Sequence, residues 1–560
     1  MIIGMLLETL GIGLIIPAIS ILVQSDFPAN YPQLRPVLRS LGNPTRAQLV
    51  TGGMLTLVGV YLIKSAFLAF LAWRQTKYSF DVQAHLSQRL FTTYLRQPYT
   101  FHLQRNSAQL IRNAIKEVAQ FVGGAITPGL LIIAESLVIL GVAALLLAVE
   151  PVGAVIVVLV LGIAGWAFQR VTRAQISRWG IARQLHEGLR LQHLQQGLGG
   201  AKDVKLLGRE TDFLAQFNEH NVQSARVGQA QATVAQLPRL WLELLGVAGL
   251  ATLVLTMMAQ GRDLATIVPT LGLFALAAFR LMPSINRVLI AAQALRYCRP
   301  AIDTLHEELK LAAPDPRLGG GAAATFGQDI RLSGVSFSYA PNIAPAIDSL
   351  SICIEKGESV GFIGPSGSGK STLVDIIMGL LTPTSGVVAV DGRDIQQNLR
   401  AWQDQIGYVP QSIYLTDDTL RRNIAFGLAN DQIDDAAVAR AVKAAQLEEF
   451  LSSLPKGLAT RVGERGVRLS GGQRQRIGIA RALYHDPGVL VLDEATSALD
   501  TSTEKDVMSA VTALQGTKTI LIVAHRTSTV ERCDRLYRLV QGRVVETGAP
   551  RSVFTQAAGS

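Results

Sequence analysis

Hydrophobic and polar positions divide the chain into two unlike parts. Up to about residue 310 the apolar residues form long, almost unbroken stretches, whereas beyond it they come in short runs between polar and glycine-rich turns. A helix that crosses the hydrocarbon core of a bilayer needs about 20 mostly apolar residues. The pattern therefore predicts six membrane-spanning helices, at residues 1–23, 52–73, 122–149, 152–168, 240–258 and 264–290.

Composition and charge favour a membrane protein that has a soluble portion. Charged residues make up 17% of the 560 residues and the mean hydropathy is +0.30, whereas an ordinary globular protein has about 25% charged residues. The net charge of +10 divides into +11 for residues 1–320 and −1 for residues 321–560. A basic excess confined to the apolar part is typical of cytoplasmic loops, so no nucleic acid is expected as a partner. The three cysteines, Cys298, Cys353 and Cys533, lie far apart and predict neither a disulfide framework nor a zinc site.

The distribution of cations also predicts the topology. Residues 74–121 and 170–239 are rich in Lys and Arg, which places them in the cytoplasm together with both termini. Both segments have the pattern of amphipathic helices prolonged beyond the membrane, although a plain solvated helix surface is the alternative. The proline-containing segment 25–50 has few cations and is expected outside. No Lys or Arg precedes Arg35, which predicts that the sequence starts partway along its first span.

A stretch of Gly, Ala and Pro at residues 312–321 marks a linker. The predicted organisation is a helical membrane domain at 1–307, a linker at 308–328 and a soluble α/β domain at 329–560.

The soluble domain opens with a phosphate-binding loop. The apolar run 359–363 predicts a buried strand, and a helical pattern starts at Thr372. The eight residues between them match the loop that binds the phosphates of ATP, in the required strand-to-helix context. They are Gly364, Pro365, Ser366, Gly367, Ser368, Gly369, Lys370 and Ser371, and Thr372, which follows them, is also expected to bind the nucleotide. The backbone N–H groups would face the phosphates, Lys370 would neutralise the β and γ oxygens, and Ser371 would offer its hydroxyl to Mg²⁺.

A second apolar strand, at 488–492, ends in two adjacent acids. Asp493 is expected to hold Mg²⁺ through water, and Glu494 to orient and deprotonate the attacking water. The alternative is a solvated strand terminus.

The residues that precede this strand resolve the alternative through a resemblance. Leu469-Ser470-Gly471-Gly472-Gln473, followed by Arg474-Gln475-Arg476, is similar to the signature of the ATP-binding cassette (ABC) family. The resemblance implies that Tyr339 stacks on adenine, that Gln411 belongs to the glutamine loop and reaches Mg²⁺, and that His525 senses the γ-phosphate. It also implies a dimer-contacting loop at 497–500 and a contact to the membrane domain through Glu464.

Six spans followed by one cassette, with long cytoplasmic helices, resemble the exporter type of ABC transporter. The resemblance implies an all-α membrane domain joined to an α/β P-loop ATPase, a homodimer, and coupling elements near 102–111 and 209–217. It further implies that each phosphate loop faces the other chain's signature, where Ser470, Gly471, Gly472 and Gln473 complete the site around ATP.

Cations inside the spans indicate what is transported, because a charge in a membrane is costly and usually functional. They are Lys64, Arg239, Arg280 and Arg287. Arginine suits bidentate contact with phosphate, which favours an anionic lipid headgroup. The alternative is structural pairing with Glu8, Glu135 or Glu243, or extension of Arg287 to the lipid headgroups.

The segments 237–243 and 280–287, with Glu8-Thr9, resemble the PglK-type flippases of lipid-linked oligosaccharides. This resemblance implies ATP-driven, outward movement of an anionic lipid-linked substrate across the bacterial cytoplasmic membrane. Lys64 stands where that family would have an arginine. A peptide, lipid or drug exporter of the same architecture is the alternative.

Overall fold

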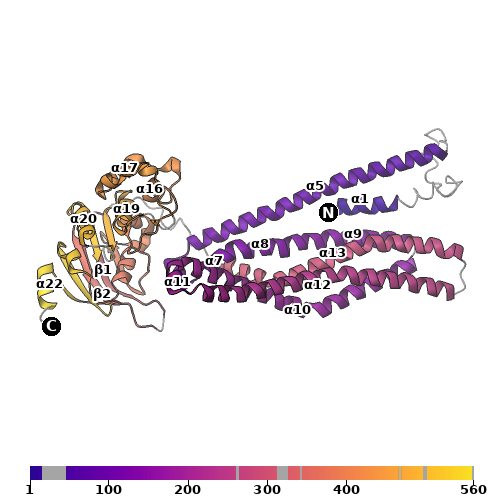
Figure 1. Cartoon of the computed structure of the whole chain (residues 1–560), viewed down its shortest axis with the longest axis horizontal. Coiled ribbons are helices and arrows are strands. Elements are labelled where there is room, and N and C mark those ends of the chain that lie inside the picture. The colour runs from indigo at the N-terminus through magenta and orange to yellow at the C-terminus, as the bar shows by residue number, and fades with distance from the viewer. Residues whose placement is uncertain are drawn as a thin grey trace. The chain divides into compact units, whose positions relative to one another are not determined.

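The computed structural model of the chain describes residues 1–14, 46–149, 151–259, 264–311, 326–340, 343–463, 466–467, 469–495 and 501–557. The chain forms two compact units (Figure 1). One consists of Met1–Arg96 and Arg105–Ala313, and the other of Gln97–Gln104 and Pro314–Ser560. The short segment Gln97–Gln104 therefore leaves the first unit and packs as part of the second.

The first unit is built from long helices that lie side by side (Figure 1). Its described elements are α1 (Ile2–Gly13), α5 (Arg46–Leu95), α7 (Ser107–Arg112), η2 (Asn113–Glu117), α8 (Val118–Phe121), η3 (Val122–Ile126), α9 (Thr127–Val149), α10 (Pro151–Gly199), α11 (Ala201–Leu207), α12 (Glu210–Ala259) and α13 (Leu264–Lys310). Helix α10 packs along α12 and α13, and α9 packs along α13.

The helices are longer than a membrane is thick. A helix of 50 residues, such as α5 or α12, spans about 75 Å at 1.5 Å per residue, against about 30 Å for the hydrocarbon core. The basic segments after the predicted second span and after the predicted fourth span continue the same helices. The prediction that these connections are helical is confirmed.

Two helical stretches in the described part are apolar and long enough to cross a membrane. They are Val50–Leu95 and Ser107–Leu145, with mean hydropathy of 2.0 and 2.2, and Ile2–Gly11 is a shorter apolar helix. Large apolar side chains stay exposed along these two stretches, such as Leu62 and Leu140, as expected of a surface that lipid or a second chain covers. The count of six spans stays a prediction.

The second unit contains two β-sheets. An antiparallel sheet has the order β2-β1-β4-β5, and a mostly parallel sheet has the order β10-β9-β3-β8-β7-β6. The strands are β1 (Asp329–Phe337), β2 (Ile347–Glu355), β3 (Ser359–Ile363), β4 (Ser385–Val390), β5 (Arg393–Asp394), β6 (Ile406–Val409), β7 (Val489–Asp493), β8 (Thr519–Val523), β9 (Arg535–Val540) and β10 (Arg543–Gly548). Strand β3 is buried on both faces, which is typical of a parallel strand covered by helices.

Helices surround the parallel sheet. They are α14 (Lys370–Ile377), α15 (Leu399–Gln403), α16 (Leu420–Ile424), α17 (Asp435–Ala444), α18 (Glu448–Ser452), α19 (Gly471–Leu483), α20 (Thr501–Thr512), α21 (Thr527–Val530) and α22 (Pro550–Ala557). One apolar cluster joins α16, α17 and α19 to strands β6 to β8, and a second fills the space between the two sheets. The strand ends that bear the predicted site residues are thereby held on a rigid core.

The predicted ends of the membrane domain at 307 and of the linker at 328 stay predictions. Helix α13 runs to Lys310, a little beyond the expected end of the membrane domain, and β1 begins at Asp329. Residues 312–325 of the linker lie outside the described residues.

Candidate nucleotide-binding site

The phosphate-binding loop joins β3 to α14 and depends on two crowded glycines. Gly364 has φ +148°, and a Cβ there would lie 2.2 Å from the carbonyl oxygen of Leu539. Gly369 has φ +98°, and a Cβ there would lie 2.4 Å from the carbonyl oxygen of Ala346. Both positions combine a left-handed backbone with neighbouring backbone that cannot give way, so only glycine fits. The loop turns tightly and presents its N–H groups at the start of α14.

Lys370 places its charge inside this loop. Its Nζ donates hydrogen bonds to the carbonyl oxygens of Gly364, at 3.0 Å, and Pro365, at 2.9 Å. Burial lowers the pKa of Lys370, and the charges of Glu494 and Asp493 act in the opposite direction. A cation held at this point of the loop can meet the phosphates, and this role of Lys370 stays a prediction.

Ser371 and Asp493 lie together and form a set of ligands that suits Mg²⁺. The Ser371 hydroxyl donates to Oδ1 of Asp493 at 3.3 Å. Burial raises the pKa of Asp493, and the neighbouring charge of Glu494 raises it further. Hydroxyl and carboxylate oxygens are the hard ligands that Mg²⁺ prefers, and a divalent cation would relieve the buried negative charge. These two residues would hold the ion, which would neutralise charge on the β- and γ-phosphates.

The three predicted catalytic residues meet at the carboxyl edge of the parallel sheet. Glu494 follows β7, Gln411 follows β6 and His525 follows β8, and these strands are neighbours. Gln411 Nε2 donates to Glu494 Oε2 at 2.8 Å, and His525 Nε2 lies 2.6 Å from Glu494 Oε1. Glu494 has φ +47°, and its backbone N–H donates to the carbonyl oxygen of Val523, so the residue is tied to the sheet.

This arrangement can do acid–base chemistry beside the phosphate loop. A carboxylate contacted on one side by an amide and on the other by an imidazole is fixed in orientation, which is what a general base requires. Gln411 directs its amide nitrogen to Glu494, so its predicted contact with Mg²⁺ stays a prediction.

Tyr339 lies at the side of the loop. Its hydroxyl is 3.0 Å from Thr372 Oγ1, and its ring packs edge-on against Phe337 with 5.0 Å between centroids. The Tyr339 side chain is exposed. A fixed aromatic ring with an accessible face can stack on a base, and the contact of Tyr339 with adenine stays a prediction.

The signature residues form the start of α19. Gln473 N–H donates to Ser470 Oγ at 3.2 Å, and Ser470 N–H donates to Gln473 Oε1 at 2.8 Å. This reciprocal capping box satisfies two backbone donors and fixes the helix start. The remaining N–H groups, at Gly471 and Gly472, belong to a helix terminus that attracts anions.

Sequence reasoning did not find how the signature helix reaches the catalytic cluster. Gln475 Nε2 donates to the carbonyl oxygen of Gln411 at 3.2 Å. Arg481, farther along α19, donates to the carbonyl oxygens of Asn423 and Tyr414 at 2.8 Å each. Burial lowers the pKa of Arg481 to about 10. No linear motif links such distant residues, so the sequence offered no signal beyond the positions of Gln475 and Arg481 on the helix.

Asp375 was also missed. Burial raises its pKa to about 6, and the charge of Asp493 raises it as well. The same two aspartates act on Tyr99, whose pKa is raised first by burial and then by these charges. Tyr99 begins helix α6 (Tyr99–Gln104), in the segment that packs with the nucleotide unit. Of the other predictions, the loop at 497–500 and Glu464 lie outside the described residues.

The cations of the predicted spans have acidic neighbours. Lys64 Nζ lies 2.6 Å from Glu8 Oε2, and both side chains are buried. Arg239 lies 2.9 Å from Glu243, and both are largely exposed. The side chain of Arg280 lies outside the described part.

Arg287 Nε lies 2.7 Å from Glu135 Oε1, which joins α13 to α9. On the adjoining face of α13, a cavity of about 450 Å³ is lined by Arg239, Leu242, Glu243, Met282, Pro283 and Asn286. The segments 237–243 and 280–287, which carry the resemblance to lipid flippases, thus border one cavity.

A phosphate loop, a signature helix and a Glu–His–Gln cluster on one unit, joined to a bundle of long apolar helices, define an ABC transporter with fused domains. Residues 347–497 match the family model described as ABC transporter, and residues 2–274 match the ABC transporter transmembrane region. The chain belongs to the ABC transporter family, and it has the fold of an exporter.

Similar proteins include curated bacterial relatives and a solved structure. The chain is 30% identical over 503 residues to an ATP-dependent lipid A-core flippase of Ralstonia nicotianae, covering 89% of this chain and 84% of the relative. It is 31% identical over 514 residues to a protein of the same name from Nitrosococcus oceani, covering 90% and 84%. A bacterial Atm1-family ABC exporter, solved with ATP bound, has a TM-score of 0.78, 23% identity, and coverage of 99% of this chain and 95% of the other.

Proposed function

We propose that the chain hydrolyses ATP to move an amphipathic anionic lipid outward across the bacterial cytoplasmic membrane. One observation supports the ATPase above all others: Glu494 lies within hydrogen-bonding distance of both Gln411 and His525, beside the phosphate loop. The helical unit supports the membrane location, with both termini and the cassette expected in the cytoplasm.

Each residue of the site has a role in hydrolysis. Lys370 and the loop N–H groups bind the β- and γ-phosphates, and Ser371 and Asp493 hold Mg²⁺. Glu494 orients the attacking water and accepts its proton, while His525 contacts the γ-phosphate and holds the carboxylate in place. Tyr339 stacks on adenine. In this scheme positioning and charge stabilisation supply most of the rate enhancement, as in other phosphoryl transfers.

The functional unit is a homodimer, because one chain has one phosphate loop and one signature. The signature of each chain closes on the phosphate loop of its partner, with the capped start of α19 facing the γ-phosphate. Hydrolysis then releases the contact, and the helical bundles change the side of the membrane to which they open.

The substrate site lies where α12 and α13 border the 450 Å³ cavity. Arg239 is exposed at its edge, and Asn286 Oδ1, at its wall, is buried without a hydrogen-bond partner among the described residues. A phosphate or pyrophosphate headgroup would compete with Glu243 and Glu135 for the arginines and would form bidentate contacts. Lys64 contributes only if the headgroup displaces Glu8.

Two glycolipid substrates share this chemistry. A lipid-linked oligosaccharide has a pyrophosphate between its lipid and its glycan, and it is the substrate that the resemblance in the spans favours. The names of the relatives favour a lipid A-core molecule instead. A peptide or drug exporter is the remaining candidate.

The test is ATP hydrolysis in proteoliposomes made of a neutral phospholipid. We expect a polyprenyl-pyrophosphate glycan to stimulate hydrolysis, and Arg280→Ala and Arg287→Ala to abolish the stimulation. Arg287→Lys keeps the charge but loses the bidentate geometry, so it should recover only part of it. Arg299→Ala is the matched control, because Arg299 is an exposed residue of the same helix, paired with Asp303. Stimulation by lipid A-core alone, or by a peptide alone, would reassign the substrate.

A further inference from the structure

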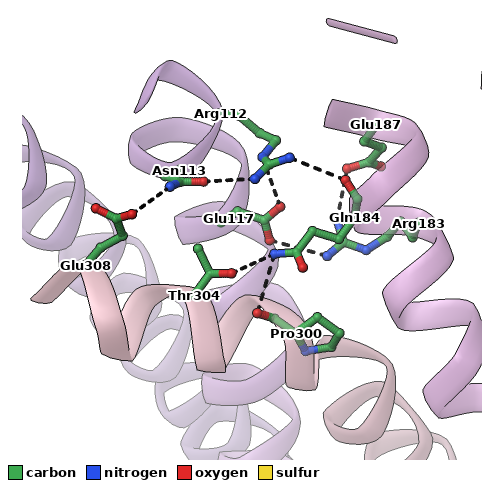
Figure 2. A network of polar contacts seen from close by, with 9 residues as sticks. All are labelled: Arg112, Asn113, Glu117, Arg183, Gln184, Glu187, Pro300, Thr304 and Glu308. Carbon is green, nitrogen blue, oxygen red and sulfur yellow. Dashed lines mark hydrogen bonds and ion pairs between the residues drawn. The ribbon is translucent and has the colours of Figure 1, made fainter. Parts of the chain in front are cut away.

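A buried cluster of charged residues lies in the helical unit (Figure 2). Three arginines and three glutamates alternate in it, so that the cluster has no net charge: Arg105, Arg112, Arg183, Glu117, Glu187 and Glu308. Glu117 and Asn113 are fully buried, and Arg183 and Glu308 are only 5% and 6% exposed. No part of the proposed ATPase or substrate site uses these residues.

The cluster joins three helical segments. Arg183 of α10 lies 3.4 Å from Glu117 of η2 and 2.9 Å from Glu187 of its own helix. Gln184 of α10 donates to Thr304 Oγ1 of α13 at 2.8 Å. Figure 2 shows these side chains pointing toward one another from the three elements.

Local backbone features bring the charges together. Asn113 and Glu117 lie at the two ends of η2, a π-helical turn, and wide turns of this kind are frequent at functional sites. On α10, a Cβ at Gly188 would lie 2.2 Å from Nη1 of Arg112. The missing side chain at Gly188 thus makes room for this guanidinium, which donates to the carbonyl oxygen of Gln184 at 3.4 Å.

Stability alone does not account for such a cluster. Burying ions costs desolvation energy, and apolar residues of similar volume often stabilise a core as well or better. Glu117 Oε1 also lacks a hydrogen-bond partner among the described residues, and its ion pair with Arg112 Nε is 3.7 Å long. An incompletely satisfied network is a poor source of stability. The position of the cluster in the chain says more about what the cluster does.

The cluster connects two of the three places where the chain passes between its units. Arg105 is the first residue of the helical unit after the segment Gln97–Gln104, and Glu308 is in the last turns of α13, just before the chain enters the nucleotide unit at Pro314. Arg105 Nη1 lies 2.6 Å from Glu308 Oε1, and Asn113 Nδ2 donates to the same oxygen at 3.2 Å. An ion pair and a hydrogen bond therefore join these two crossings.

We propose that Arg105, Asn113 and Glu308, together with the Glu117–Arg183 pair, are positioning residues that couple ATP turnover to helix movement. They hold these two chain crossings and α10 as one body, so that closure of the cassettes moves the helices and does not bend the two crossings separately. This proposal rests on the proposed ATP-driven transport, because it assigns the residues that transmit that work.

The test uses the full chain in lipid nanodiscs, in the Glu494→Gln background so that ATP binds without turnover. A spin label at Leu206→Cys, an exposed position of α11, reports the distance between two copies with and without ATP. We expect a clear ATP-dependent change in the parent. Glu308→Gln and Arg105→Gln should at least halve its amplitude, with the affinity for ATP unchanged within twofold.

Three further variants separate coupling from folding. Gly188→Ala should displace the Arg112 guanidinium without altering any charge and should reduce the amplitude, even if Glu308→Gln fails to fold. The exchange Arg105→Glu with Glu308→Arg restores the ion pair and should recover more than half of the amplitude. Arg299→Gln, which removes an exposed pair of α13, should have no effect.

An unchanged amplitude in folded Gly188→Ala, Glu308→Gln and Arg105→Gln proteins would overturn the proposal, as would failure of the exchange to restore it. In active protein, transport per ATP should fall at least fivefold in Glu308→Gln while basal hydrolysis stays within twofold. If no lipid moves in the parent but the label distances depend on the cluster, the transport proposal fails and the coupling proposal stands.

Discussion

Replacing Glu494 by Gln should abolish turnover while leaving ATP bound. In the parent, Gln411 Nε2 donates to the Glu494 carboxylate at 2.8 Å. The amide of the variant keeps one oxygen that can accept this hydrogen bond, so the geometry of the cluster should survive. What is lost is the base. General acid–base catalysis contributes roughly 10²- to 10⁴-fold, or about 3 to 5 kcal/mol of transition-state stabilisation. We therefore expect kcat to fall by at least 100-fold.

The same substitution should not weaken binding of MgATP. The negative charge of Glu494 raises the pKa of Asp493, so its removal lowers that pKa and favours the ionised carboxylate that holds Mg²⁺. Nucleotide affinity, measured by fluorescence with a labelled ATP, should be equal or tighter. Glu546→Gln is the matched control, since Glu546 has the same side-chain exposure of 16% and a basic neighbour at 3.4 Å. A kcat within tenfold of the parent would refute Glu494 as the base.

Three other predictions test the loop, a membrane ion pair and a buried acid. Gly364→Ala should lower the thermal stability of the cassette and abolish ATP binding, because its Cβ would meet the backbone of Leu539. Gly367→Ala, at φ +76° with open space around it, should lower the thermal stability less, and equal losses would contradict the crowding argument. Lys64→Met should destabilise the protein by about 3 to 5 kcal/mol, as expected for a broken buried pair. The double variant with Glu8→Gln should regain most of this stability in thermal melts, and no regain would show that the two residues act independently. Asp375→Asn should stabilise the protein by about 3 kcal/mol above roughly pH 7, because the pKa of this carboxyl rises from 3.8 to about 6 on folding and its contribution to stability is lost as pH rises through that window. A gain of the same size at pH 3.5, in melts of both proteins, would exclude this cause.

The nucleotide site was largely predictable because each of its parts is a short run of residues in a fixed structural context. The phosphate loop needs its glycines at defined positions, and the acids follow a buried strand, so sequence order alone placed Lys370, Ser371 and Asp493. The meeting of Gln411, Glu494 and His525 was implied only through the family resemblance, and the structure adds that their strands are neighbours.

The helical unit was harder to predict because its informative residues look ordinary in sequence. Glu117 and Arg183 occur in basic, amphipathic segments for which a solvated surface was an open alternative, yet both are buried. Their burial depends on the π turn at Asn113–Glu117 and on the close approach of α10 at Gly188. Neither feature alters the hydrophobic period, so no pattern could reveal them. The acidic neighbours of Lys64, Arg239 and Arg287 were named in advance as alternatives, but their distances required the structure.

The central claim, that ATP joins the cassettes of two chains and so drives the helices, is tested most directly by cross-linking. In a Glu494→Gln protein with Ser366→Cys and Ser470→Cys, the two new thiols should belong to facing partners. We predict that a short bifunctional thiol reagent links two chains rapidly when MgATP is present and at least tenfold more slowly without it. Cross-linking that is equally fast without nucleotide, or absent with it, would contradict the account.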